Sequence, residues 1–216
     1  MLFDLDGTLA DTAPDLCAPA NALRAERGLT ALPVEDLGRF ASSGARGLLA
    51  RALELHPGDA DYEAVRLDFL ARYEAALCVH TKVFDGLEPV LQSLETDGIA
   101  WGVVSNKIER FVRPILLQLG LAERSACAVG GDTAGQAKPH PAPLLHATKM
   151  IGVDPAACVY VGDDLRDVQA GKAAGMITVA AAYGYCGTDD PPSRWGADLI
   201  VHHPAELGAW LAGAAR

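Results

Sequence analysis

Short apolar runs recur along the chain from residue 99 onward, and stretches with helical periodicity separate them. Each run is apolar at successive positions rather than at alternating ones, which is typical of parallel strands covered on both faces. The runs are Ile99–Val104, Ala126–Val129, Cys158–Val161, Met176–Ala180 and Leu199–Val201. The helical candidates between them are Glu109–Leu119, Pro143–Ile151 and Leu165–Ala174. This alternation predicts an α/β fold with a doubly wound parallel sheet.

The segment from Pro14 to Val79 contains no convincing strand. Leucine and aromatic residues recur in it at helical spacing, and helix breakers interrupt them at Gly28, at Pro33 and at His56-Pro57-Gly58-Asp59. We therefore expect an α-helical domain at residues 14–79. It would be inserted into an α/β core formed by residues 1–13 and 80–216.

Size, charge and cysteine content exclude several classes of protein. A chain of 216 residues with 50% hydrophobic residues can bury a core, and a net charge of −10 argues against nucleic acid as a partner. No apolar run is as long as a membrane span and no signal peptide precedes the first acidic motif, so we expect a cytoplasmic protein. The five cysteines have no C-x-x-C spacing, which favours reduced thiols.

Polar side chains follow the expected strands at their carboxyl ends, where doubly wound sheets bind ligands. The motifs are Asp4-Leu5-Asp6-Gly7-Thr8, Ser105-Asn106-Lys107, Lys138-Pro139 and Gly162-Asp163-Asp164-Leu165-Arg166-Asp167. Taken singly, each also fits a helix cap, an N-terminal helix acid or a surface charge. Together they place carboxylates, a hydroxyl group and an amine at one edge of the sheet. Paired aspartates suit Mg²⁺, which takes phosphate oxygens as further ligands.

In this order, the motifs resemble those of haloacid dehalogenase superfamily phosphatases with a helical cap of type C1 after the first motif. The resemblance covers essentially the whole chain. Within the superfamily the chain is most similar to bacterial phosphoglycolate phosphatases, and it is also similar to N-acetylmuramic acid 6-phosphate phosphatases. Tyr160–Met176 and Tyr183-Gly184-Tyr185 look like both groups. The resemblance implies a cytoplasmic, Mg²⁺-dependent phosphomonoester hydrolase that acts on a small phosphorylated metabolite through an aspartyl-phosphate intermediate.

The resemblance also implies a role for individual residues. Asp4 matches the nucleophile and Asp6 the general acid and base. Phosphate-binding residues would be Thr8, Ser105, Asn106 and Lys138. Metal ligands would be Asp4, the backbone carbonyl of Asp6, and Asp163, with Asp167 in supporting contact. Attack by a carboxylate divides a difficult hydrolysis into two steps, and Mg²⁺ and Lys138 would offset the repulsion between two anions.

The motifs match the other reactions of this superfamily less well. Dehalogenases lack an acid at the position of Asp6, and phosphonatases need a cap lysine, whereas residues 14–79 contain no lysine. A phosphosugar mutase and a non-catalytic phosphometabolite-binding protein remain as alternatives. An inactive relative would normally lack one of the two aspartates.

By the same resemblance, phosphoglycolate is the leading expected substrate, and N-acetylmuramic acid 6-phosphate is the alternative. Both carry a carboxylate, which Arg46 could bind as a bidentate partner, with Gly44 allowing close approach in the loop Ser42–Gly47. An exposed arginine at a helix start is a nearly equal interpretation of Arg46. Thr12 is a further candidate for substrate recognition, at the entry to the site. Only three residues precede Asp4, so we expect a shortened first strand or a natural start upstream of Met1. The sequence leaves monomer and dimer both open.

Overall fold

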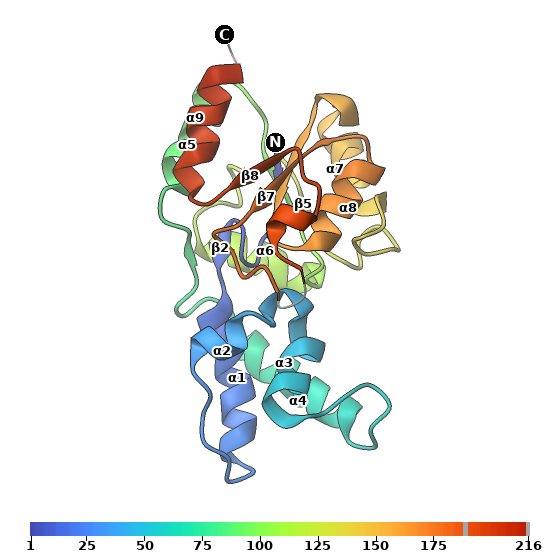
Figure 1. Ribbon diagram of the computed structural model, residues 1–216. Helices are drawn as coiled ribbons and strands as arrows, with labels where there is room; N and C mark the ends of the chain where they lie inside the picture. Colours follow the sequence, from blue (N-terminus) through green and yellow to red (C-terminus); the bar gives the residue numbers. More distant parts are fainter. Residues whose placement is uncertain (188–189, 215–216) are drawn as a thin grey trace.

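The computed structural model describes residues 1–187 and 190–214, and its centre is a six-stranded parallel sheet (Figure 1). The strands are β1 (Leu2–Phe3), β4 (Gly102–Val104), β5 (Ala128–Val129), β6 (Val159–Gly162), β7 (Ile177–Ala181) and β8 (Leu199–Val201). Their order across the sheet is β5-β4-β1-β6-β7-β8. The chain therefore moves outward from β1 through β4 to β5, and then returns to β6 on the other side of β1. This topology confirms the predicted doubly wound α/β fold.

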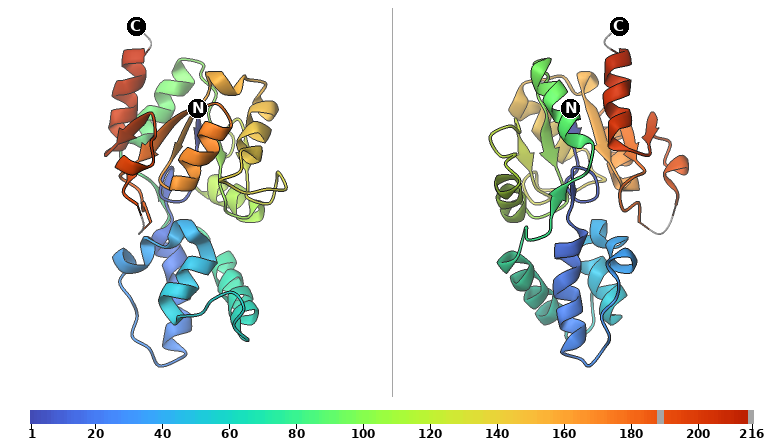
Figure 2. Two further views of the ribbon diagram at one scale, coloured as in Figure 1. Left: turned by 45° about the vertical axis from the view of Figure 1, so that its right-hand side comes forward. Right: turned by 90° about the vertical axis from the view of Figure 1, so that its left-hand side faces the viewer.

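Helices cover both faces of the sheet, as Figure 2 shows from two sides. They are α5 (Leu87–Thr96), α6 (Glu109–Gln118), α7 (Ala142–Ile151), α8 (Leu165–Ala173) and α9 (Pro204–Ala214). Successive side chains of a strand point to opposite faces. Accordingly, Phe3 packs in the cluster that contains residues of α5, α6 and α9, whereas Leu2 packs with residues of α7 and α8.

Strand β1 is only two residues long, yet it occupies the centre of the sheet. Leu2 and Phe3 are fully buried, and each pairs with one residue of β4 and one residue of β6. The Asp4 N–H then donates to the Val161 carbonyl at 2.9 Å. Burying each of these two side chains stabilises the fold by about 1.5–3 kcal/mol. Neighbouring strands on both sides therefore fix the backbone up to Asp4.

Four helices form a separate group below the sheet in Figure 1. They are α1 (Ala13–Ala25), α2 (Val34–Gly38), α3 (Gly44–Leu53) and α4 (Tyr62–Ala75), and we call residues 13–75 the helical block. Helix α1 contacts the other three, and buried side chains such as Leu23, Leu49 and Phe69 fill the space between them. Among the described residues, no helix has the length and apolarity that a membrane crossing requires.

Two chain segments connect the helical block with the sheet, and they pair with each other. Strands β2 (Ala10–Asp11) and β3 (Lys82–Val83) are antiparallel. Asp15, in the first turn of α1, accepts hydrogen bonds from the backbone N–H groups of Val79, His80 and Thr81, and from the Thr81 hydroxyl. One carboxylate thus ties the start of the helical block to the segment that leaves it.

Candidate active site

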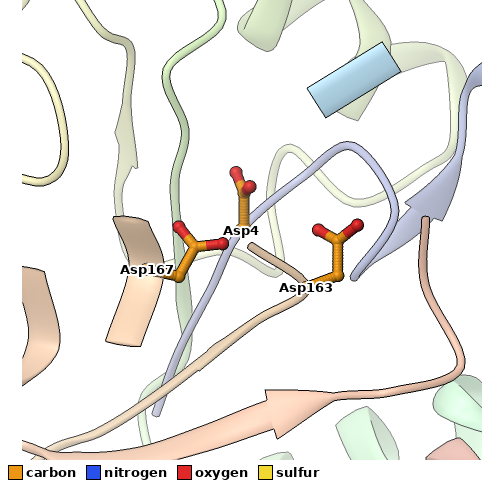
Figure 3. A group of neighbouring side chains, drawn as sticks. All are labelled: Asp4, Asp163 and Asp167. Carbon is orange, nitrogen blue, oxygen red and sulfur yellow. The ribbon is translucent and has the colours of Figure 1, made fainter. Parts of the chain in front are cut away.

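Three carboxylates meet at the carboxyl ends of β1 and β6 (Figure 3). Asp4 follows β1, Asp163 follows β6, and Asp167 lies in the first turn of α8. One oxygen of each lies within 4.8 Å of the others. Their exposed fractions are only 6% for Asp4, 0% for Asp163 and 2% for Asp167. These are the three aspartates expected, together with Asp6, to hold a metal.

Local backbone geometry brings the acids together. Asp164 is the N-cap of α8, and it forms a capping box with Asp167 that fixes the Asp167 carboxylate at the helix start. Gly7 has a φ of +78°, and a side chain there would collide with the Asp163 carboxylate. A side chain at Gly184 would collide with the Gly7 carbonyl and with Asp163. Two glycines therefore let the loops after β1 and β7 close around Asp163.

Lys138 is buried in contact with the acids, and its side chain is only 2% exposed. Its Nζ is 3.1 Å from Asp4 Oδ1, 2.6 Å from Asp167 Oδ1 and 2.7 Å from the Tyr160 hydroxyl oxygen. Asn106 holds the Lys138 backbone on both sides, because its amide nitrogen donates to the Lys138 carbonyl and its amide oxygen accepts from the Lys138 N–H. The Asn106 side chain is thus used to place Lys138.

Burial dominates the acid–base properties of this cluster. Removal from water raises the pKa of Asp163 well above its usual range, and the charges of Asp4 and Asp167 raise it further. Burial also raises the pKa of Asp167 to about 7, with Lys138 opposing the shift. For Lys138, burial alone would lower the pKa, but the charges of Asp167 and Asp4 raise it on balance.

The donor set of the cluster fits Mg²⁺. The Lys138 ammonium pairs with two of the three buried carboxylates, so a bound cation or retained protons must balance the remaining negative charge. Carboxylate oxygens are the hard ligands that Mg²⁺ prefers. Asp4, Asp163 and Asp167 would hold the ion, and their roles as ligands stay predictions, as does that of the Asp6 carbonyl.

Asp6 lies in a different electrostatic environment from Asp4. The Thr12 hydroxyl donates to Asp6 Oδ1 at 2.5 Å, and Lys107 Nζ is 3.0 Å from the same oxygen. Thr12 is fully buried, so the structure places it under Asp6 rather than at the mouth of the site. Thr8 is also fully buried, and its hydroxyl donates to Asp163 Oδ1 at 3.1 Å. Both threonines therefore contact acids, and their expected contacts with phosphate and with substrate stay predictions.

A cavity of about 360 Å³ opens over the acids, between the sheet and the helical block. Asp4, Asp6 and Ser105 line its floor, and Gly44 and Arg46 of the expected substrate loop line its opposite wall. A larger hollow of about 750 Å³ lies beside Asp11 and Tyr185, but none of the clustered acids lines it. The smaller cavity is therefore the candidate active site.

Three contributors were not identified from the sequence. The sequence indicates Lys107 only as part of its motif, although its ammonium pairs with Asp6. It indicates Tyr160 only as a buried residue of a strand, although its hydroxyl contacts Lys138. The Tyr185 hydroxyl accepts from the N–H groups of Thr12 and Ala13, while its backbone N–H donates to Asp163. The repeated tyrosines at 183 and 185 were the available signal, but their spacing does not reveal their partners.

Comparison with known proteins places the chain in a family. Residues 1–181 match the family model of haloacid dehalogenase-like hydrolases. A phosphoglycolate phosphatase of Xanthomonas campestris is 49% identical over 213 residues, covering 97% of this chain and 96% of that protein. An N-acetylmuramic acid 6-phosphate phosphatase of Pseudomonas putida is 47% identical over 207 residues, covering 96% of this chain and 93% of that protein.

A solved structure agrees with this placement. The crystal structure of a predicted phosphoglycolate phosphatase from Haemophilus somnus superimposes with a TM-score of 0.85 at 27% identity, covering 97% of this chain and 96% of that one. These relatives confirm the resemblance inferred from the motifs, and their names agree with the expected enzyme class, a phosphatase. The chain belongs to the haloacid dehalogenase-like hydrolases.

Proposed function

We propose that the protein is a Mg²⁺-dependent phosphomonoester phosphatase in which Asp4 is the nucleophile. The observation that carries this proposal is the position of Asp4. Its carboxylate faces the cavity, lies 3.1 Å from the Lys138 ammonium and shares a cluster with Asp163 and Asp167. When bound there, Mg²⁺ would supply positive charge that offsets repulsion between Asp4 and a phosphate dianion.

The chain's own residues supply the remaining steps. An oxygen of Asp4 attacks phosphorus, the bond from phosphorus to the ester oxygen breaks, and the leaving alcohol takes a proton from Asp6. Water then attacks the aspartyl phosphate and gives a proton to Asp6, which releases phosphate and restores Asp4. Ser105 lines the cavity floor beside both acids, where its hydroxyl can donate to a phosphoryl oxygen. The Lys138 ammonium, in contact with Asp4, stabilises the negative charge of its carboxylate.

The helical block would act as a cap that closes the cavity, with the boundaries 14–79 predicted from the sequence. Two contacts between the helical block and the loops of the α/β core support this role. The Ser42 hydroxyl donates to Asp163 Oδ2 at 3.3 Å, and the Arg166 guanidinium donates to the Ser42 carbonyl at 2.8 Å. Closure of this kind excludes water and strengthens electrostatic interactions inside the site.

Phosphoglycolate is the substrate that we propose first, because the Xanthomonas relative of that name is 49% identical over nearly the full chain. N-acetylmuramic acid 6-phosphate is the second candidate, since a cavity of about 360 Å³ has room for more than a two-carbon acid. Both compounds carry a carboxylate, and Arg46 lines the cavity. We propose action in the cytoplasm.

The test is phosphate release from p-nitrophenyl phosphate with Mg²⁺. Asp4→Asn should lower kcat at least 1,000-fold, about the size of other nucleophile losses, whereas Asp61→Asn changes an exposed aspartate and serves as the matched control. Equal rates for Asp4→Asn and the parent would refute the mechanism. Ranking phosphorylated acids and sugars by kcat/KM then identifies the substrate. Phosphate transfer to a sugar phosphate in place of net release would identify a mutase instead.

A further inference from the structure

We propose that Lys107 is the specificity-determining residue that binds a substrate carboxylate attached next to the phosphate ester. This inference rests on the proposed function and narrows its substrate class. It assigns the site to phosphate esters of 2-hydroxy acids, in which one carbon carries both the ester oxygen and the carboxylate. Phosphoglycolate belongs to this class, whereas the carboxylate of N-acetylmuramic acid 6-phosphate lies many bonds from its phosphate.

The position of Lys107 relative to Asp6 is the main observation. Lys107 Nζ lies 3.0 Å from Asp6 Oδ1, its side chain is only 6% exposed, and it lines the cavity over the acids. No step of the proposed hydrolysis uses its charge. A buried cation in the wall of a substrate cavity is costly unless anions surround it, and Asp6 supplies one of them.

Asp6 fixes where the leaving group must lie. To give its proton to the ester oxygen, its carboxyl group must come within about 3 Å of that oxygen. The carbon that follows the ester oxygen must therefore lie beside Asp6. A carboxylate on that carbon would then come close to an ammonium that contacts the same Asp6 oxygen. This placement pairs the carboxylate with Lys107 while the phosphate remains at Asp4 and Ser105.

Lys107 also has donor capacity left for a ligand. An ammonium carries three N–H groups. Within residues 1–187 and 190–214, Asp6 is the only residue that forms an ion pair with it. Its Nζ lies 4.8 Å from the centre of the Tyr73 ring, a cation–π contact that steadies the charge. The Tyr73 hydroxyl is buried and has no hydrogen-bond partner among the described residues. The Lys107 ammonium can therefore donate to a ligand placed at this corner of the cavity.

The other cations that line the cavity suit a carboxylate farther from the phosphate. Arg46 and Arg66 belong to the helical block, and neither forms an ion pair with Asp6 among the described residues. Arg66 pairs with Glu63, and Arg166 pairs with Asp164. Lys107 is thus the cavity-lining cation that directly contacts the proposed general acid. A substrate whose carboxylate adjoins the ester would use Lys107, and a longer acid would reach the arginines.

The experiment compares two esters that differ at one group. Phosphoglycolate carries a carboxylate where 2-hydroxyethyl phosphate carries a hydroxymethyl group. We expect the parent to prefer phosphoglycolate in kcat/KM by about 10- to 100-fold, typical of one charge-assisted contact. In Lys107→Met this preference should fall below about 3-fold, with the larger change in the KM of phosphoglycolate. Lys149→Met removes an exposed lysine on α7 and should keep the parent's preference.

A second variant keeps the result interpretable if Lys107→Met does not fold. Lys107→Gln can still donate to Asp6 but lacks the charge, and it should lose the preference in the same way. If either folded variant loses rate equally on both esters, Lys107 only positions Asp6 and the inference is wrong. A parent that hydrolyses both esters without preference also overturns it, but leaves the proposed function intact. A parent inactive on both esters and on p-nitrophenyl phosphate overturns the proposed function, and this inference with it.

Discussion

Replacing Asp15 with alanine tests how the helical block is attached to the sheet. Asp15 is 4% exposed, and its carboxylate accepts from the backbone of three successive residues in the segment that leaves the block. Oδ2 also accepts from the Thr81 hydroxyl at 2.7 Å. Alanine would remove the acceptor and leave all of these donors in place.

The expected loss follows from the burial of each donor. The two Thr81 bonds are buried, and bonds to a charged acceptor contribute about 1.5–3 kcal/mol each. Val79 and His80 are exposed residues, so water can replace the carboxylate at their N–H groups. Asp15→Ala should therefore lower the free energy of unfolding by about 3–5 kcal/mol. In a chain of this size that corresponds to a fall in Tm of roughly 10 °C.

Urea unfolding and thermal melts of the purified variants provide the measurement. Thr81→Val removes one of the two buried bonds and should lower the free energy of unfolding by about 1.5–3 kcal/mol. Asp36→Ala removes an exposed acid from the first turn of another helix and should stay within about 0.5 kcal/mol of the parent. A loss below 1 kcal/mol for Asp15→Ala would show that pairing of β2 with β3 holds the connection, and not the carboxylate.

Tyr185→Phe leaves the N–H groups of Thr12 and Ala13 without their acceptor, so hydrogen exchange at these two amides should accelerate about tenfold or more; unchanged exchange would contradict the contact. Mg²⁺ should bind more tightly as the pH rises from 5 to 7, because burial raises the pKa values of Asp163 and Asp167 and the metal must displace their protons. Calorimetry at several pH values tests this, and a pH-independent affinity would refute it. Without metal, the folded state retains a proton on Asp167 that the unfolded chain releases, so stability should fall as the pH rises from about 4 to about 7. Flat thermal melts across that range would contradict the shift.

The acids could be located from the sequence because strand ends in a parallel sheet share one edge. Asp4 and Asp163 each follow an apolar run, and the order of the runs suffices to place both at that edge. The strands themselves are shorter than the runs. Residues 99–104 predicted one strand, but only Gly102–Val104 forms β4, and Ile99 is 43% exposed. The apolar run begins before the strand because Trp101, which directly precedes β4, packs edge-on against Phe3.

Side-chain direction within the loops could not be predicted in the same way. Thr8 and Thr12 lie near the acids along the chain, but only the folded loop turns their hydroxyls toward Asp163 and Asp6. Asp15 resembled an ordinary acid in a first helical turn, and its partners are 64 to 66 residues away. Tyr185 meets Thr12 across 173 residues. Contacts at such separation have no local pattern in the sequence.

An acidic protein that binds phosphate must place its cations precisely, and the two aspartates of the first motif receive one lysine each. Lys138 contacts Asp4 but is not among the residues that line the cavity. Lys107 approaches Asp6 within the cavity wall, on the side where the alcohol would leave. A lysine that contacts the nucleophile would serve any phosphate ester, because the phosphate group is the same in all of them. A lysine that contacts the general acid would lie beside the leaving alcohol, which differs from one substrate to another. The net charge of −10 therefore does not prevent recognition of a substrate with two anionic groups.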